Sequence, residues 1–148
     1  MSVFKDFSAH FAQSVCLLTS KDGSGEKTCT ISSYNSVSSS LDSDLFSFSL
    51  SSNSYMAGVV KETSHVRVCL LGSNQSNAAN FFVKNRVSNA EFELSKIVST
   101  SIGFAEGEVT SRINVGASTL YIVAVHNIEI MNANLTPLVY RLRQYQSP

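Results

Sequence analysis

Residues 30–37 read Thr-Ile-Ser-Ser-Tyr-Asn-Ser-Val, a run rich in hydroxyl groups and β-branched residues that carries no charge. The segment that follows, Asp44 to Leu50, alternates Phe46, Phe48 and Leu50 with serines. This period of two predicts a strand whose apolar side chains share one buried face. A further series of small hydroxyls ends that strand: Ser51, Ser52 and Ser54.

These hydroxyls allow two interpretations. Backbone N–H groups and hydroxyls donate well to phosphates and to the edges of heterocycles, so the stretch is suited to a flat ligand with polar edges. Serines also occupy the solvent face of many antiparallel sheets, where they bind nothing. The chemistry of these residues favours ligand binding and a solvent-exposed sheet face about equally.

Length and composition restrict the class of protein. The chain has 148 residues, which suits a single domain over 1–148 with a sizeable core. Hydrophobic residues make up 43% and charged residues 15%, a balance that favours a folded chain over a disordered one. The net charge is zero without a basic block, so we expect no nucleic-acid partner.

No segment of the sequence predicts membrane insertion or secretion. The longest apolar run, Leu120 to Val125, is far shorter than the roughly 20 residues that cross a bilayer, so we expect no membrane association. The N-terminal residues 1–6 lack the apolar segment of a signal peptide. We therefore expect a cytoplasmic protein.

Side chains capable of catalysis or metal binding are scattered along the chain. The sequence contains no nucleophile elbow, phosphate-binding glycine loop or zinc signature, so we expect no metal site. We interpret the cysteines as reduced and buried, the paired carboxylates as solvated, and the histidines as structural. These are Cys16, Cys29 and Cys69; Asp42, Asp44, Glu106 and Glu108; and His65 and His126.

Cap residues and apolar spacing predict three short helices. Ser2 is expected to cap an N-terminal helix whose phenylalanines share one face, and Ser54 a helix over 55–62. Ser73 or Asn74 is expected to cap a third helix, over 75–83. We expect 37–42 to be a connector and 84–101 a loop.

Strands outnumber helices in this interpretation. They are expected at 15–19, 27–33, 45–50, 66–71, 108–115, 119–130 and 138–145. Because they do not alternate regularly with helices, the pattern favours a closed antiparallel barrel with helices at its ends over a doubly wound sheet.

Three motifs occur in an order typical of one family. Thr30 to Ser38 is close to the pattern Thr-Val-Ser-Ser-Phe-Thr-Ser-Val-Ser, Leu71 to Gln75 matches Leu-x-x-x-Gln, and Pro137 to Tyr145 matches Pro-Leu-x-Tyr-x-x-x-x-Tyr. In this order they resemble the flavin reductase-like family, the reductase components of two-component flavin monooxygenases. The resemblance implies a mainly β fold, an antiparallel split β-barrel with short flanking helices.

The resemblance also implies an activity. It predicts an NAD(P)H-dependent flavin reductase that binds FMN or FAD, takes NADH or NADPH as co-substrate, and passes hydride from nicotinamide C4 to flavin N5. Reduced flavin would go to a partner oxygenase, and the protein would be a homodimer. Its flavin-binding residues would be Thr30, Ser32, Ser33, Asn35, Ser36, Ser49, Ser51, Ser52 and Ser54.

Two departures from the family pattern qualify these expectations. Gly116-Ala117-Ser118 stands where many members have Gly-Asp-His, the histidine associated with nicotinamide use. Relatives also often place Arg or Lys in the turn that aligns with Ser52 and Asn53, so phosphate here would depend on hydroxyls, amides and Lys84 or Arg86. A flavin-binding or electron-transfer module without reductase activity is therefore the alternative, and a structural barrel without flavin is a third.

Overall fold

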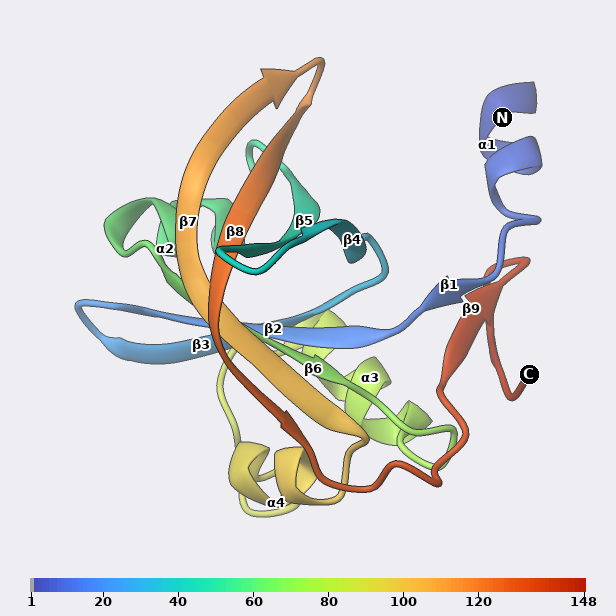
Figure 1. Cartoon of the computed structure of the whole chain (residues 1–148). Helices are drawn as coiled ribbons and strands as arrows, with labels where there is room; N and C mark the ends of the chain where they lie inside the picture. The colour runs from blue at the N-terminus through green and yellow to red at the C-terminus, as the bar shows by residue number, and fades with distance from the viewer. Residues whose placement is uncertain (1) are drawn as a thin grey trace.

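Two long strands, β7 (Gly103–Val115) and β8 (Ser118–Ile130), form the spine of the fold. In the computed structural model, which describes residues 2–148, they belong to a seven-stranded antiparallel sheet of order β3-β2-β6-β7-β8-β5-β4 (Figure 1). A smaller antiparallel sheet, β1-β9-β10, brings the two ends of the chain together. The other strands are β1 (Gln13–Ser14), β2 (Cys16–Asp22), β3 (Gly25–Ile31), β4 (Asn35–Ser39), β5 (Asp44–Ser51), β6 (His65–Leu70), β9 (Val139–Arg141) and β10 (Gln144–Gln146). The helices are α1 (Val3–Ser8), α2 (Tyr55–Glu62), α3 (Ser76–Lys84) and α4 (Leu94–Ser99).

The central strands are covered on both faces. One face carries a cluster in which Phe48 stacks on Tyr121, with 4.7 Å between ring centroids, and to which α2 contributes Met56. The other face packs β2 and β6 against α3 and α4, with Phe82 in that second cluster. Because β2 is buried on both faces, residues 15–18 read as a continuous apolar run rather than an alternating one.

Two irregularities in β7 accompany the curvature of the sheet. The register with β8 shifts at Glu106/Gly107 and again between Val109 and Ser111, and Figure 1 shows β7 curved along its length. Gly107 lies at the first shift, where a Cβ atom would come within 2.0 Å of the Ala124 carbonyl oxygen. Only glycine allows two backbones to approach this closely.

The antiparallel, mainly β class with short flanking helices is confirmed. The closed barrel is not found: β3 and β4 are the two edges of the large sheet, and no strand pairing joins them within residues 2–148. The helix over 55–62 and its cap are confirmed, since Ser54 Oγ accepts from Ala57 N at 3.2 Å. The three cysteines are free and buried, as expected.

Two segments expected to be irregular form regular structure. The connector expected at 37–42 is wrong, because Asn35–Ser39 forms β4, which pairs with β5 and is exposed along its whole length. A strand without a buried face carries no apolar alternation that could reveal it. The loop expected at 84–101 contains α4, where Leu94 and Ile97 are buried. A helix of six residues is too short to establish a period by itself.

Two further expectations need correction. Neither Ser73 nor Asn74 caps α3: Gln75 occupies the cap position, without a side-chain cap bond. Its buried amide instead accepts from Gly72 N and donates to the Ile97 carbonyl, each at 3.0 Å, and so ties α3 to α4. The single strand expected over 138–145 is a β9–β10 hairpin, whose turn places two residues at positive φ, Leu142 and Arg143.

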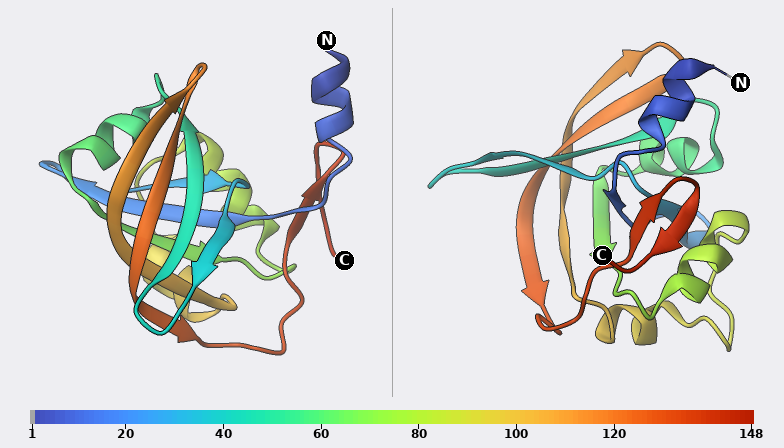
Figure 2. Two further views of the ribbon diagram at one scale, coloured as in Figure 1. Left: turned by 45° about the horizontal axis from the view of Figure 1, so that its top comes forward. Right: turned by 90° about the vertical axis from the view of Figure 1, so that its right-hand side faces the viewer.

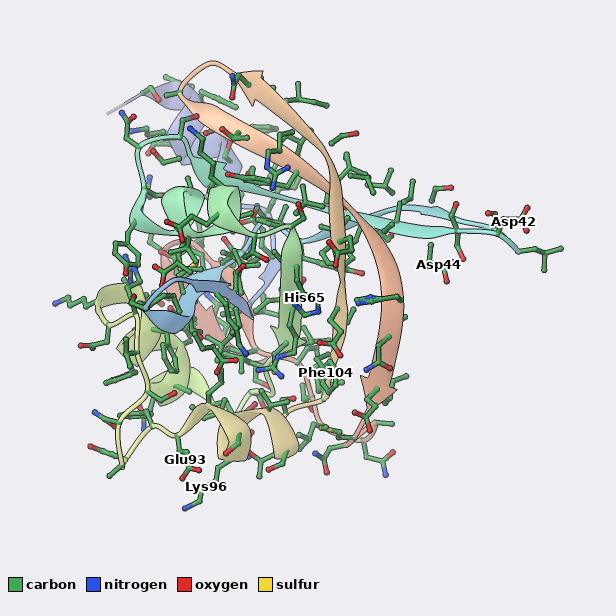
Figure 3. All side chains as sticks on the ribbon, turned by 90° about the vertical axis from the view of Figure 1, so that its left-hand side faces the viewer. Asp42, Asp44, His65, Glu93, Lys96 and Phe104 are labelled. Atoms are coloured by element: carbon green, nitrogen blue, oxygen red, sulfur yellow. The ribbon has the colours of Figure 1, made fainter. Side chains whose placement is uncertain are left out.

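Two parts of the chain stand away from the body. One is α1, where Ser2 Oγ accepts from Lys5 N as predicted. The other is the β4–β5 hairpin (Figure 2), with Asp42 and Asp44 near its tip (Figure 3). Within residues 2–148, every helix is too short or too polar to cross a membrane. Both projections expose apolar side chains: Phe4 at 67% and Phe7 at 65% on α1, and Leu41 at 106% on the hairpin. Phe11, which follows α1, is 57% exposed.

Candidate functional site

The hydroxyl-rich ends of β3 and β5 meet at one pocket of about 330 Å³. Strand β3 and the residues after it supply one wall, β5 and the start of α2 a second, and the end of α3 a third. Hydroxyls and a single cation mix with an apolar floor, a composition typical of ligand pockets. The lining residues are Cys29, Thr30, Ile31, Ser32, Ser33, Ser49, Leu50, Ser51, Ser54, Met56, Phe82, Val83 and Arg86.

The pocket unites most of the site residues expected from the sequence and leaves four of them outside. Asn35 lines an adjoining pocket of about 480 Å³, which shares Ser32 and Ser33 with the first. Ser36 lies on the exposed strand β4, and Lys84 is exposed at the end of α3. Ser52 turns toward β8 instead: its Oγ lies 2.9 Å from Thr119 Oγ1, and its N–H donates to the Ala117 carbonyl.

Hydrogen bonds between distant segments hold the walls together. Ser33 Oγ donates to the Ser49 carbonyl and accepts from Ser49 N, each at 3.0 Å, which fastens the end of the β3 segment to β5. Thr30 Oγ1 donates to the Ala79 carbonyl at 2.6 Å and so fastens β3 to α3. These two hydroxyls shape the pocket. Ser32 and Ser51 make no side-chain hydrogen bond within the described chain and remain available to a ligand.

Arg86 is the cation of this pocket. Its Nη1 donates to the carbonyls of Phe82 at 3.4 Å and Val83 at 3.1 Å, and its own carbonyl accepts from Thr28 N at 2.8 Å. Its Nε is buried without a hydrogen-bond partner, and the guanidinium carbon lies 6.0 Å from the Tyr55 ring centroid. No carboxylate of residues 2–148 forms an ion pair with it. The pocket therefore presents an uncompensated positive charge beside hydroxyl donors, an arrangement that suits an anion.

The apolar part of the pocket was not anticipated from the sequence. Met56, Phe82 and Val83 contribute to its floor, and the first two are also members of the buried clusters. Their spacing on α2 and α3 is that of ordinary core residues. No local pattern distinguishes a helix face that covers a sheet from one that also borders a cavity.

The thiol of Cys29 lies in the wall of the pocket and is shielded from solvent. Burial raises the pKa of Cys29 to about 12, against a smaller lowering effect of Arg86, and burial likewise raises the pKa of Cys16 to about 12. Thiolate is the reactive species, and an unfolded cysteine has a pKa of about 8.5. These two thiols are therefore protonated in the folded protein at pH 8.

We expect the native protein to resist thiol reagents. At pH 8 the Cys16 and Cys29 thiols should react about a thousandfold more slowly than in urea, measured by absorbance with a disulfide-exchange reagent. Their folded pKa exceeds the unfolded one, so their contribution to the free energy of unfolding is complete below about pH 8.5 and declines toward pH 12. Equal labelling rates with and without urea would contradict this assignment.

The turn between β7 and β8 carries the residues that replace the expected Gly-Asp-His. Gly116 has a φ of 57°, and the carbonyl of Ala117 accepts from Ser52 N, one residue beyond the pocket-lining Ser51. No histidine occurs in this turn or in the lining of the pocket. His65 and His126 lie against one another elsewhere, with ring centroids 5.4 Å apart.

A family model matches nearly the whole chain. Residues 8–148 match the model of the flavin reductase like domain. The chain belongs to the flavin reductase-like family. The resemblance seen in the sequence is thereby confirmed, and it covers nearly the whole chain. No curated protein sequence matches the chain significantly.

Solved structures of flavin reductases share the fold of this family member. The styrene monooxygenase flavin reductase SMOB from Pseudomonas putida S12 is 24% identical with a TM-score of 0.85, over 99% of this chain and 97% of that one. A flavin reductase domain protein from Arthrobacter sp. FB24 is 24% identical with a TM-score of 0.86, over 98% and 93% of the chains. The flavin reductase HpaC, solved with NADP+, is 20% identical with a TM-score of 0.79, over 99% and 96%.

Proposed function

We propose that this protein is an NAD(P)H-dependent flavin reductase that binds FMN in the Arg86 pocket. The observation that carries the proposal is the uncompensated Arg86, with its buried and unpartnered Nε, beside hydroxyls that line the same cavity. A flavin phosphate supplies the missing negative charge. Ser54 caps α2 at this wall, and a helix N-terminus favours anions as well. FAD carries a phosphate in the same place and is the second flavin that fits.

The remaining lining suits the rest of a flavin. Ser32 and Ser51 offer hydroxyls to a polar ring edge and ribityl chain, and Met56 and Phe82 offer apolar contact to the flat ring. The adjoining pocket with Asn35 extends the available space beyond Ser33. Together the two pockets fall within the size range of cofactor sites.

Bound flavin would supply the redox chemistry, by accepting a hydride at N5 from nicotinamide C4. This chain would bind the two ring systems, orient them and exclude water, because the cofactors carry the chemistry themselves. HpaC was solved with NADP+, and another structural neighbour is an NADH:FAD oxidoreductase, which supports a nicotinamide co-substrate. Reductases of a styrene monooxygenase and a tryptophan halogenase are also neighbours, which supports transfer of reduced flavin to a partner oxygenase.

A second candidate function rests on the β7–β8 turn. Ser118 stands where many family members have a histidine. The β7–β8 turn therefore offers no imidazole that could contact a bound nicotinamide. A flavin-binding or electron-transfer module of the same fold, without reductase activity, is consistent with that turn. The same binding pocket would serve both functions.

One preparation separates these functions. The purified protein is titrated with FMN and followed by its visible spectrum, and NADH and NADPH oxidation are then measured with free FMN present. We expect saturable binding and flavin-dependent oxidation. Binding without oxidation would establish the second candidate function, and no binding of FMN or FAD at high micromolar concentration would exclude both.

We further propose a cytoplasmic homodimer in which a second copy covers the open side of a split barrel. An apolar groove of about 430 Å³, lined among others by Val68, Leu70 and Ile130, opens there. The exposed phenylalanines of α1 and Leu41 on the β4–β5 hairpin supply apolar surface that such a dimer would bury. Light scattering after size exclusion should give twice the mass of the chain, and a monomer at micromolar concentration would contradict the proposal.

A further inference from the structure

The proposed function leaves a small pocket between β3 and the C-terminal hairpin unassigned. It measures about 160 Å³, and its lining residues are Val15, Thr30, Ile31, Ser32, Val83, Tyr140 and Tyr145. All of them except Val15 and the two tyrosines also line the Arg86 pocket, so the two cavities adjoin. Pockets that hold a whole drug-sized ligand measure about 300–1,000 Å³. The smaller pocket therefore has room for one ring system of a ligand whose other parts lie in the Arg86 pocket.

Two tyrosines form the wall of this pocket that faces the C-terminal hairpin. Tyr140 on β9 and Tyr145 on β10 lie opposite each other in that hairpin, which pairs with β1 (Figure 1). Their ring centroids are 5.4 Å apart, and their ring planes differ by 59°. A third flat ring can therefore stack on the face of one tyrosine and meet the edge of the other.

The hydroxyls of Ser32, Tyr140 and Tyr145 are available to a ligand. None of the three makes a hydrogen bond within residues 2–148. Burial raises the pKa of Tyr145, and the neighbouring Tyr140 raises it further, so this phenol keeps its proton at neutral pH. Each of these hydroxyls can donate to the edge of a heterocycle or accept from it.

The lining of the pocket is uncharged and in part apolar. None of its residues is acidic or basic, so the pocket suits a neutral ring better than an anion. Val83 on α3 is 51% exposed, and a ring bound here would remove part of that apolar surface from water.

The pocket begins beside the cation that would hold a phosphate. Arg86 Nη1 donates to the Val83 carbonyl at 3.1 Å, and Val83 lines both cavities. A nucleotide whose phosphate pairs with Arg86 can therefore extend its base past Val83 toward the tyrosines. Adenine is such a base: it is flat and uncharged, and its edge carries both acceptor nitrogens and an amino donor. This step rests on the proposed function, which places a flavin phosphate at Arg86.

We propose that Tyr140 and Tyr145 form an adenine-binding subsite beside the flavin pocket. The adenine ring stacks on the tyrosine pair, and the Ser32 hydroxyl meets its polar edge. The ring is that of a dinucleotide, FAD or NAD(P)H, so the subsite favours dinucleotides over the corresponding mononucleotides.

Adenosine monophosphate (AMP) tests the subsite without flavin. The full chain with ¹³C-labelled tyrosine is titrated with AMP and, separately, with ribose 5-phosphate, which carries a phosphate but no base. We expect saturable shifts of the Tyr140 and Tyr145 ring signals, and nuclear Overhauser effects from the adenine protons to these rings, with AMP alone. Tyr121, which is 3% exposed and stacked on Phe48, is the internal control and should not move.

Variants and matched ligands identify the source of the adenine. Tyr145→Leu removes base–aromatic stacking and Tyr145→Phe keeps it, so the Kd of AMP should rise about fivefold or more in the first and less than about twofold in the second. If the adenine is that of FAD, Tyr145→Leu lowers the preference for FAD over FMN by a similar factor. If it is that of NADH, the variant instead lowers the preference, in kcat/KM, for NADH over reduced nicotinamide mononucleotide.

The proposal is overturned if AMP moves neither tyrosine signal saturably, or if ribose 5-phosphate moves them equally. It is also overturned if FMN binds but Tyr145→Leu changes neither preference, in which case the flavin site stands without an adenine subsite. If FMN does not bind at all, the proposed function fails, and the AMP titration still decides the subsite. The wild-type titration likewise decides if Tyr145→Leu does not fold.

Discussion

Replacing Gly107 with alanine lowers the free energy of unfolding by about 3–5 kcal/mol, the largest effect we expect from any single methyl group in this chain. The added Cβ would lie 2.0 Å from the Ala124 carbonyl oxygen and 2.8 Å from its carbonyl carbon. Both are backbone atoms of β8, so no side-chain rotation relieves the contact. Relief requires the two longest strands to separate at the bulge, where β7 changes register.

Gly58→Ala is the matched control for this substitution. Gly58 lies in α2, and the position that an added methyl group would take has no neighbouring atom within 4 Å. The free energy of unfolding of the Gly58→Ala variant should therefore be about 0.5–1 kcal/mol higher than that of wild type, because alanine has the higher helix propensity. Urea denaturation followed by circular dichroism compares the two variants with wild type. A Gly107→Ala variant within about 1 kcal/mol of wild type would show that β7 and β8 are not held this closely.

Replacing Arg86 with methionine weakens FMN binding by about ten- to a hundredfold. The loss corresponds to about 1.5–3 kcal/mol, the usual contribution of a hydrogen bond to a charged group, because methionine keeps the packing but removes the charge beside the pocket hydroxyls. Arg86→Lys keeps the charge but not the planar fork, and should give an intermediate affinity. The FMN affinities of wild type, Arg86→Met and Arg86→Lys are measured by fluorescence titration.

Lys84→Met controls for the loss of positive charge. Lys84 lies two residues before Arg86 but is exposed and outside the pocket, so its removal should change FMN affinity less than about twofold. Thermal melting of Arg86→Met is measured alongside, since Arg86 also donates to the carbonyls of Phe82 and Val83. If the Lys84 and Arg86 variants lose FMN affinity equally, Arg86 does not contact the flavin directly.

Local patterns located the longer elements that have a buried face. The alternation of Phe46 and Phe48 located β5, and the cap at Ser54 located α2. The same logic failed for β4, which is exposed along its length, and for the six-residue α4. Local patterns also could not predict whether the sheet closes into a barrel, because strand order depends on pairing between residues far apart in the chain.

Hydroxyls of residues 30–33 and of residues 49–54, both assigned to flavin through the family resemblance, line one pocket in the structure. Which of these hydroxyls remain free was not predictable. Thr30 and Ser33 look as available as Ser32 in the sequence, yet one bonds to the Ala79 carbonyl and the other to Ser49. Those partners lie 49 and 16 residues away, beyond the range of any local pattern.

Motifs, short-range periodicity and residue chemistry were enough to identify the family, the antiparallel strands and the polar character of the stretch at Thr30 to Val37. The tertiary structure alone decided between Lys84 and Arg86 as the cation of the pocket. Helix α3 ends with Lys84 in solvent, and the bond from Thr28 N to the Arg86 carbonyl ties Arg86 to β3 beside the pocket. Two cations two residues apart are alike in sequence, and only the packing of α3 against β3 distinguishes them.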